Sequence, residues 1–399
     1  MKQRYEVPRE KAVQVSSLLD REDVDMLLVL TREGTDKAVP LLVGTRAIHL
    51  GAMIFRRSGR HTMITSKSDQ GNFLETGVFS EVDVYGEDLS EPLKDLLHEE
   101  KPRRVAMNYS ESDHLCDGLT LGLYTWFEDL MGAEWIEAHV VPSESILKDL
   151  RGIKTEAEIG RIEKAVQITC DIYDEVFEKV RCGMSEREIG AIFSEGMKKR
   201  GVVNGIEGGL APPMVLIVRA GMAHRGPGDT KTVPGDLVVM DASVRFEGYC
   251  SDIARSMYFL KKGESRAPEE VQKAFDTVIR AINASMEALV PENCGWEVDA
   301  AGRAVIEAGG YPTVKHSVGH QVGMECHDGG TRLGPKKPGK KDVDRHIQLS
   351  EVYAVEPTVL QDKDKPSFIV EENVLVTDKG VRVLSRRQTE LVLVPPAGV

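Results

Sequence analysis

Hydrophobic and polar positions follow two different patterns in the two parts of the chain. In the first part, short apolar runs such as Met26–Leu30 and Thr62–Thr65 are separated by stretches with helical spacing. In one of these stretches, Leu89–Glu99, leucines recur every three or four residues, which places them on one face of a helix. Strands that alternate with helices predict an α/β domain over residues 1–150.

Long helical repeats replace this pattern after Val141-Pro142-Ser143. Thr155–Val180 carries apolar residues at helical spacing and begins with a threonine followed by acids, which suit a helix N-terminus. Ser185 opens a second helix with the pattern of a capping box. Short apolar strands follow later in the chain. We therefore place a domain boundary near residue 150 and expect a second domain, of α+β type, over residues 151–399.

The segment Gly235–Met257 has the pattern of a β-hairpin. An apolar run ends at Asp241, Glu247-Gly248 is typical of a two-residue turn, and a second strand leads back. This turn would place Asp241 opposite Ala254, so that Asp252 lies on the same face as a diagonal neighbour. A buried ionised carboxylate is costly unless it is paired or binds metal. The hairpin alone leaves two interpretations open, a shared cation site and two surface acids.

More candidate ligands follow this hairpin. His316, His320 and His327 fall within twelve residues and are separated by glycines, although the whole chain has only ten histidines. Glu356 ends an apolar strand, and Glu371 lies in the apolar segment Phe368–Val376, which we expect to form another strand. Four carboxylates with one imidazole suit Mn²⁺, and also Co²⁺, Fe²⁺ or Zn²⁺. The same set can neutralise two divalent ions.

Composition narrows the possible partners and compartments. The length of 399 residues suggests two domains. The net charge of −13 argues against nucleic acid or an anionic membrane as the main partner. No apolar run approaches the ~20 residues that span a bilayer, and the N-terminal segment has no signal-peptide core. Six scattered cysteines without paired spacing favour the reducing cytoplasm.

These segments resemble the creatinase/aminopeptidase P/prolidase family of pita-bread metallopeptidases. The matching segments are Asp241-Ala-Ser, Ser251–Arg255, His316–Asp328, Val355-Glu356-Pro357 and Val370–Thr377. The resemblance implies a pita-bread catalytic domain over residues 151–399. Residues 1–150 resemble the family's creatinase-type N-terminal domain only in length and in α/β character.

The resemblance also implies a site with two divalent metal ions, with Mn²⁺ expected and Co²⁺, Zn²⁺ or Fe²⁺ as alternatives. The implied metal ligands are Asp241, Asp252, His320, Glu356 and Glu371. A hydroxide between the metals would attack the scissile carbonyl, and Glu356 would handle its proton. His224 and His327 would contact substrate and steady the tetrahedral intermediate, and His316 would lie near the substrate's proline.

The implied activity is hydrolysis of the Xaa-Pro bond of a short peptide, of prolidase or aminopeptidase P type, by a cytoplasmic homodimer. Two alternatives are a hydrolase or lyase of a small non-peptide metabolite and a non-catalytic binding protein. Five residues depart from the family pattern and bear on the proline preference. Ile369 replaces an arginine, Gln321 and Thr358 replace glycines, Cys326 replaces a valine and Asp328 replaces a glutamate.

Overall fold

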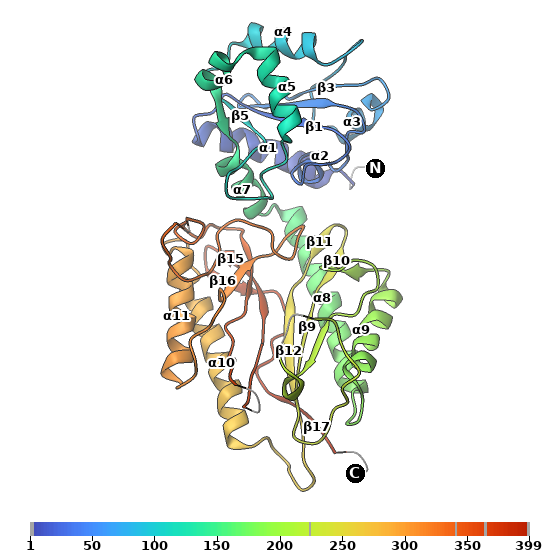
Figure 1. The fold of residues 1–399 in the computed structure, drawn as a ribbon, viewed down its shortest axis with the longest axis vertical. Helices are drawn as coiled ribbons and strands as arrows, with labels where there is room; N and C mark the ends of the chain where they lie inside the picture. The colour runs from blue at the N-terminus through green and yellow to red at the C-terminus, as the bar shows by residue number, and fades with distance from the viewer. Residues whose placement is uncertain (1–3, 223–224, 340, 363–364, 397–399) are drawn as a thin grey trace. The chain divides into compact units, whose positions relative to one another are not determined.

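The computed structural model describes residues 4–222, 225–339, 341–362 and 365–396. The chain divides into two compact units, Met1–Arg151 and Gly152–Val399 (Figure 1). Within the described ranges, no helix is long and apolar enough to cross a membrane.

The first unit is built on one six-stranded sheet with strand order β4-β3-β2-β1-β5-β6. Its strands are β1 (Met26–Thr31), β2 (Gly51–Arg56), β3 (Thr62–Thr65), β4 (Glu81–Val84), β5 (Val105–Met107) and β6 (Val140–Pro142). Its helices are α1 (Glu6–Arg21), α2 (Val39–Val43), α3 (Gln70–Thr76), α4 (Ser90–Glu100), α5 (Leu121–Met131), α6 (Ala133–His139) and α7 (Glu144–Gly152), which ends at the unit boundary. Every residue of β1 is buried, and a strand covered on both faces reads as a continuous apolar run.

The second unit contains two four-stranded sheets, β17-β12-β9-β8 and β13-β14-β15-β16, and a small sheet β11-β10-β7. Its first strands are β7 (Val203–Asn204), β8 (Met214–Ile217), β9 (Leu237–Ala242), β10 (Val244–Phe246), β11 (Tyr249–Cys250) and β12 (Ile253–Phe259). The remaining strands are β13 (Gly319–Gln321), β14 (Val352–Val355), β15 (Glu372–Thr377), β16 (Gly380–Val383) and β17 (Val392–Val394).

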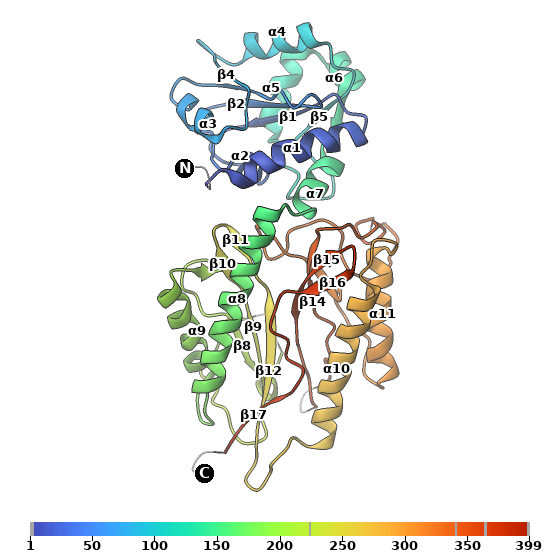
Figure 2. The ribbon, with the colours of Figure 1, turned by 180° about the vertical axis from the view of Figure 1, so that it is seen from behind.

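Helices line both large sheets of this unit. They are α8 (Glu156–Lys179), α9 (Glu186–Arg200), α10 (Glu269–Ala288) and α11 (Gly295–Ala308), with the short 3₁₀ helix η1 (Val218–Ala220). Both views place α8 and α9 beside the sheet of β8, β9 and β12, and α10 and α11 beside the sheet of β14–β16 (Figures 1 and 2). The candidate ligands lie within strands of the two sheets or directly next to them.

The two predicted helix starts are confirmed. Thr155 and Ser185 each form a capping box with the glutamate three residues later. Inside α8, the hydroxyl of Tyr173 donates to the carbonyl oxygens of Met240 and Ile253 at 2.9 and 2.7 Å. Because these two residues lie on β9 and β12, the tyrosine fixes the helix to the central hairpin.

The register of this hairpin is confirmed. Asp241 lies opposite Ala254 in the antiparallel pairing of β9 and β12. Glu247 and Gly248 form the turn with φ angles of 46° and 88°, and two left-handed residues match the right-handed twist of a hairpin.

The returning strand is interrupted, which the sequence pattern did not predict. Ser251 and Asp252 lie between β11 and β12, outside either strand. At this break the hydroxyl of Ser243 donates to the Ser251 carbonyl at 2.6 Å, so a side chain replaces part of the strand ladder. The hairpin passes here from the four-stranded sheet into the small sheet.

A second difference concerns the predicted strand Phe368–Val376. Strand β15 begins only at Glu372, and Phe368 pairs with Val359 as an isolated bridge. Between them, the backbone N–H of Glu371 donates to the Ala254 carbonyl at 3.1 Å. Glu371 therefore lies against β12, where Asp252 is close by.

Candidate metal centre

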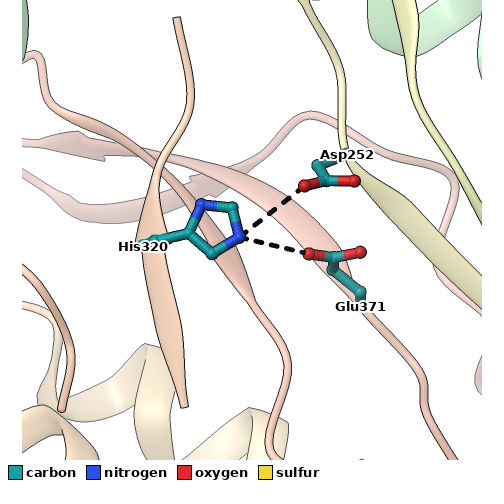
Figure 3. A group of neighbouring side chains, drawn as sticks. All are labelled: Asp252, His320 and Glu371. Atoms are coloured by element: carbon teal, nitrogen blue, oxygen red, sulfur yellow. Dashed lines mark ion pairs between the residues drawn. The ribbon is translucent and has the colours of Figure 1, made fainter. Parts of the chain in front are cut away.

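Three predicted ligands meet where the two large sheets approach each other. Asp252 comes from the break before β12, Glu371 from the residue before β15, and His320 from the middle of β13 (Figure 3). One donor atom from each side chain lies within 4.8 Å of the others. His320 Nε2 is 3.6 Å from Asp252 Oδ2 and 3.9 Å from Glu371 Oε1. Glu356, directly after β14, places Oε1 3.8 Å from the same nitrogen.

The side chain of Asn373 fixes the backbone of Asp252. The N–H of Asp252 donates to Asn373 Oδ1 at 2.9 Å, and Asn373 Nδ2 donates to the Asp252 carbonyl at 2.7 Å. Asn373 is fully buried, so this amide replaces the strand pairing that is lost at the break. The sequence pattern alone assigns no role to Asn373. The available signal was an asparagine inside an apolar strand, where this residue type is depleted.

The imidazole of His320 directs one ring nitrogen at the acids. Its Nδ1 lies 3.2 Å from the Gln321 carbonyl oxygen, so Nδ1 carries the hydrogen and Nε2 directs its lone pair at the acids. Burial lowers the pKa of His320 to about 3, and the nearby His327 adds to this shift. A neutral imidazole whose second nitrogen is held by a carbonyl is the usual form of a metal-ligating histidine.

The surrounding acids repel one another. Burial, followed by the charges of Asp241 and Glu356, raises the pKa of Asp252 well above its usual range. Burial and the neighbouring acids do the same for Glu371. Burial and the charge of Asp241 raise the pKa of Glu356 to about 8. A divalent cation would reverse this effect, because it stabilises every ionised carboxylate around it.

One carboxylate oxygen of Asp252, Oδ1, is buried without a hydrogen bond from the described residues. A buried polar atom in this state indicates an ion or water that completes its contacts. Together with the lone pair of His320, this oxygen shows that the residues fit a divalent metal ion.

Asp241 lies at the edge of this group. Its charge raises the pKa values of all three neighbouring acids, but its carboxylate is outside the compact set formed by Asp252, His320 and Glu371. Asp241 also lines a cavity of about 430 Å³. Other lining residues include Ile206, Pro212, Pro213 and Arg225. The cavity offers room for a small substrate next to the candidate ligands.

The three predicted substrate histidines have different outcomes. His327 is exposed, and its ring centroid lies 4.3 Å from that of His320. Both ring nitrogens of His316 form hydrogen bonds within the protein. Nδ1 lies 2.6 Å from the Ser317 carbonyl oxygen, and Nε2 lies 2.9 Å from Thr358 Oγ1. His224 lies outside the described residues.

Ile369, which stands where the family pattern has an arginine, makes a hydrophobic contact. Ile369 packs against the apolar core of the unit, and its carbonyl accepts a hydrogen bond from Ser256 Oγ at 2.8 Å. Arg255 lies nearby, and its charge opposes the burial and the neighbouring acids that raise the pKa of Glu371. It donates to the backbone carbonyl of Glu371 at 2.6 Å and to the side chain of Glu372 at 2.9 Å.

The fold and the candidate ligands agree with a class of hydrolases that depends on divalent metal. The sequence profile of metallopeptidase family M24 matches residues 160–378. The chain therefore belongs to metallopeptidase family M24 and is a metal-dependent hydrolase.

Curated relatives include two archaeal enzymes. The chain is 31% identical over 256 residues to the Xaa-Pro dipeptidase of Pyrococcus furiosus, an alignment that covers 62% of this chain and 67% of that protein. The Xaa-Pro dipeptidase of Pyrococcus horikoshii is 29% identical with the same coverage.

Solved structures share the fold along most of the chain. An X-Pro aminopeptidase from Thermotoga maritima superposes with a TM-score of 0.72 at 22% identity, covering 94% of this chain and 99% of that chain. The Xaa-Pro dipeptidase from Bacillus anthracis gives a TM-score of 0.72 at 21% identity, covering 97% and 100%. At these identities the likeness shows the fold alone, the mixed α/β fold of the pita-bread prolidases.

Proposed function

We propose that the protein is a two-metal exopeptidase that hydrolyses Xaa-Pro bonds in short peptides. Membership of metallopeptidase family M24 and the relatedness to Xaa-Pro dipeptidases support this proposal. The observation that carries it is the buried group of acids around the neutral His320.

The proposed ligands divide into two sets that share two acids. Asp241 would hold one ion and His320 with Glu356 the other, while Asp252 and Glu371 would contact both. When bound, the divalent ions supply Lewis acidity for the scissile carbonyl and lower the pKa of a coordinated water. Mn²⁺ is the proposed metal, because oxygen ligands dominate the set.

The chain's own side chains would handle protons and substrate. Glu356 is the proposed proton acceptor, because its carboxylate reaches the centre of the group, with Oε1 3.8 Å from His320 Nε2. His327, beside His320 and exposed, is the proposed contact to the carbonyl oxygen. His224 and His316 remain proposed substrate contacts, and the cavity beside Asp241 would receive the peptide.

We further propose that Met1–Arg151 is a creatinase-type N-terminal domain and Gly152–Val399 the pita-bread catalytic domain. The six-stranded sheet of the first unit supports the former, and the family match within the second supports the latter. A cytoplasmic homodimer is also part of the proposal.

A second candidate function is hydrolysis or cleavage of a small non-peptide metabolite on the same centre. The contact between His316 and Thr358 favours it, because it occupies a histidine otherwise expected at the substrate's proline. The replacement of the family's arginine by Ile369 points the same way.

Metal-stripped protein reconstituted with Mn²⁺, Co²⁺ or Zn²⁺ tests the proposal on Xaa-Pro dipeptides, Xaa-Pro-Yaa tripeptides and Xaa-Ala controls. We expect metal-dependent cleavage of the proline peptides only. Cleavage limited to dipeptides would assign a prolidase, and release from tripeptides an aminopeptidase P. Failure to cleave any of these peptides with metal bound would contradict the proposal and favour the small-metabolite alternative.

A further inference from the structure

A buried lysine lies close to the candidate centre although it belongs to no ligand set. Lys154 stands between α7 and α8, and its side chain is 0% exposed. Its Nζ lies 2.9 Å from Asp328 Oδ2, on a side chain that is only 3% exposed. A buried ion pair is weak evidence for stability, because desolvation of both charges opposes their attraction.

The pair closes the loop that follows β13. Asp328 Oδ1 accepts the backbone N–H of Glu325 at 3.2 Å, and the N–H of Asp328 donates to the Gln321 carbonyl at 2.9 Å. The carboxylate thus uses one oxygen inside the loop and the other for Lys154. A shift of Lys154 would release the carboxylate that holds the loop closed.

Gly323 shows how tightly this arrangement is packed. A Cβ atom at this position would lie 2.0 Å from Asp328 Oδ2 and 2.7 Å from Lys154 Nζ. The carbonyl of Gly323 also accepts the N–H of Cys250 at 2.7 Å, which ties the loop to β11. The ion pair is therefore packed directly against the loop backbone and has little freedom to rearrange.

The same loop presents His327. Its two neighbours are buried and anchored, Asp328 by Lys154 and Cys326 by a hydrogen bond to Ser243 Oγ at 2.8 Å. His327 itself is exposed, with its ring 4.3 Å from that of His320. The backbone on both sides of this exposed ring is therefore anchored.

We propose that Lys154 is a positioning residue. Its ion pair with Asp328 fixes the loop that holds the His327 ring beside His320. The role in catalysis rests on the proposed function, in which His327 contacts the substrate. Lys154 itself touches no substrate and acts only through Asp328 and the loop.

Substitution of the pair tests this role by kinetics. Lys154→Met removes the ammonium at similar length, and Asp328→Asn removes the opposite charge while keeping an acceptor for Glu325. Each is expected to lower kcat/KM about a hundredfold, the loss that a 1 Å misplacement can cause. Mn²⁺ affinity should not show the roughly 10–100-fold loss expected of a residue that supports a metal ligand, because the pair acts on the loop of His327. If Lys154→Met does not fold, Asp328→Asn carries the test.

A His327→Ala background separates positioning from general damage. If Lys154 acts through His327, Lys154→Met should have no further effect on kcat/KM in that background. An equal loss in both backgrounds would overturn the proposal. Lys11→Met is the matched control, because Lys11 is also fully buried but lies in the first unit. It should leave kcat/KM unchanged.

Histidine ¹³C–¹H NMR gives a readout that does not depend on activity. Lys154→Met should shift or broaden the ring resonance of His327 and leave that of His346, a histidine elsewhere on the same unit, in place. An unchanged His327 resonance would overturn the positioning role. If the unmodified protein cleaves no Xaa-Pro peptide but this shift occurs, only the proposed function has failed.

Discussion

Glu371 and Glu372 are consecutive in the chain and almost completely buried, but they lie in opposite electrostatic surroundings. Glu372 receives the Arg255 guanidinium at 2.9 Å, the Ser385 hydroxyl, and the Gln388 N–H at 3.1 Å. Glu371 instead faces other acids and a neutral imidazole, and its pKa is raised well above its usual range. Burial is common to both residues.

The contrast shows which feature of a buried acid indicates metal. Arg255 satisfies Glu372 inside the protein, so that site needs no further partner. In the neighbouring cluster, Asp252 Oδ1 accepts no hydrogen bond within the described residues, and burial and the charges of Asp241 and Glu356 raise the pKa of Asp252. A buried acid that lies among other acids points to a metal, whereas a buried acid paired with an arginine is structural.

The largest expected effect comes from removing a ligand. Asp252→Asn should lower metal-dependent activity about a thousandfold, because metal stabilisation of the transition state is worth several kcal/mol and each 1.4 kcal/mol is tenfold. The free energy of unfolding of the metal-free protein should not fall, since the change removes a repelling charge. Steady-state kinetics and denaturant unfolding measure both quantities. Full activity of this variant would show that Asp252 does not bind a metal that the reaction needs.

The matched change at Glu372, which pairs with Arg255, should lower stability and leave metal binding intact. Glu372→Gln leaves Arg255 buried without its carboxylate and should lower the free energy of unfolding by about 3 kcal/mol. Mn²⁺ binding by the folded protein should persist, because Glu372 faces away from the cluster toward Arg255. Loss of metal binding without loss of stability would show that the two regions are not separate.

An intermediate effect is expected at Asn373. Asn373→Ala removes the amide that holds the Asp252 backbone on both sides. Supporting residues of this kind typically contribute 10–100-fold to metal affinity, so Mn²⁺ affinity should fall by roughly that factor. Competition against a metal indicator measures it. An unchanged affinity would mean that the break at Asp252 keeps its shape without Asn373.

The stability of the metal-free protein should depend on pH through Glu356. Folding raises the pKa of Glu356 to about 8, so its protonated form favours the folded state. That contribution is fully present below the usual carboxyl value of 4.5 and is lost as pH rises to about 8. The Tm of metal-free protein should fall across this window, and saturating Mn²⁺ should offset the fall. Glu356→Gln should flatten the metal-free slope, and an unchanged slope would count against this origin.

The smallest effect concerns Thr358. Thr358→Gly removes the hydroxyl 2.9 Å from His316 Nε2 and leaves this nitrogen available to substrate. One hydrogen bond is worth about 1 kcal/mol, so KM for Xaa-Pro peptides should fall about fivefold with kcat unchanged. Initial rates on Xaa-Pro and Xaa-Ala peptides test this. Equal changes in KM for both peptides would show that His316 does not take part in proline recognition.

Local chemistry was sufficient to predict the elements around the site. Glu247-Gly248 specified the turn, and the alternation around it specified the register that brings Asp241 opposite Ala254. Likewise, the capping residues Thr155 and Ser185 predicted where α8 and α9 begin. These features depend on residues within a few positions of one another.

Features that depend on distant contacts were not predictable in this way. The break at Asp252 depends on Asn373, which is 121 residues away. The late start of β15 depends on the pairing of Glu371 with Ala254 on another sheet. Lys154 and Asp328, separated by 174 residues, carry no local signal of their contact. In each case the sequence marks the residue type but not its partner.

Calorimetric titration of metal-stripped protein with Mn²⁺ tests the central claim most directly. The account predicts saturable binding of two ions per chain, weakened strongly by Asp252→Asn and retained by Glu372→Gln. Absence of binding, or equal binding by the protein and its Asp252→Asn variant, would contradict the assignment of this buried acidic cluster as a metal centre.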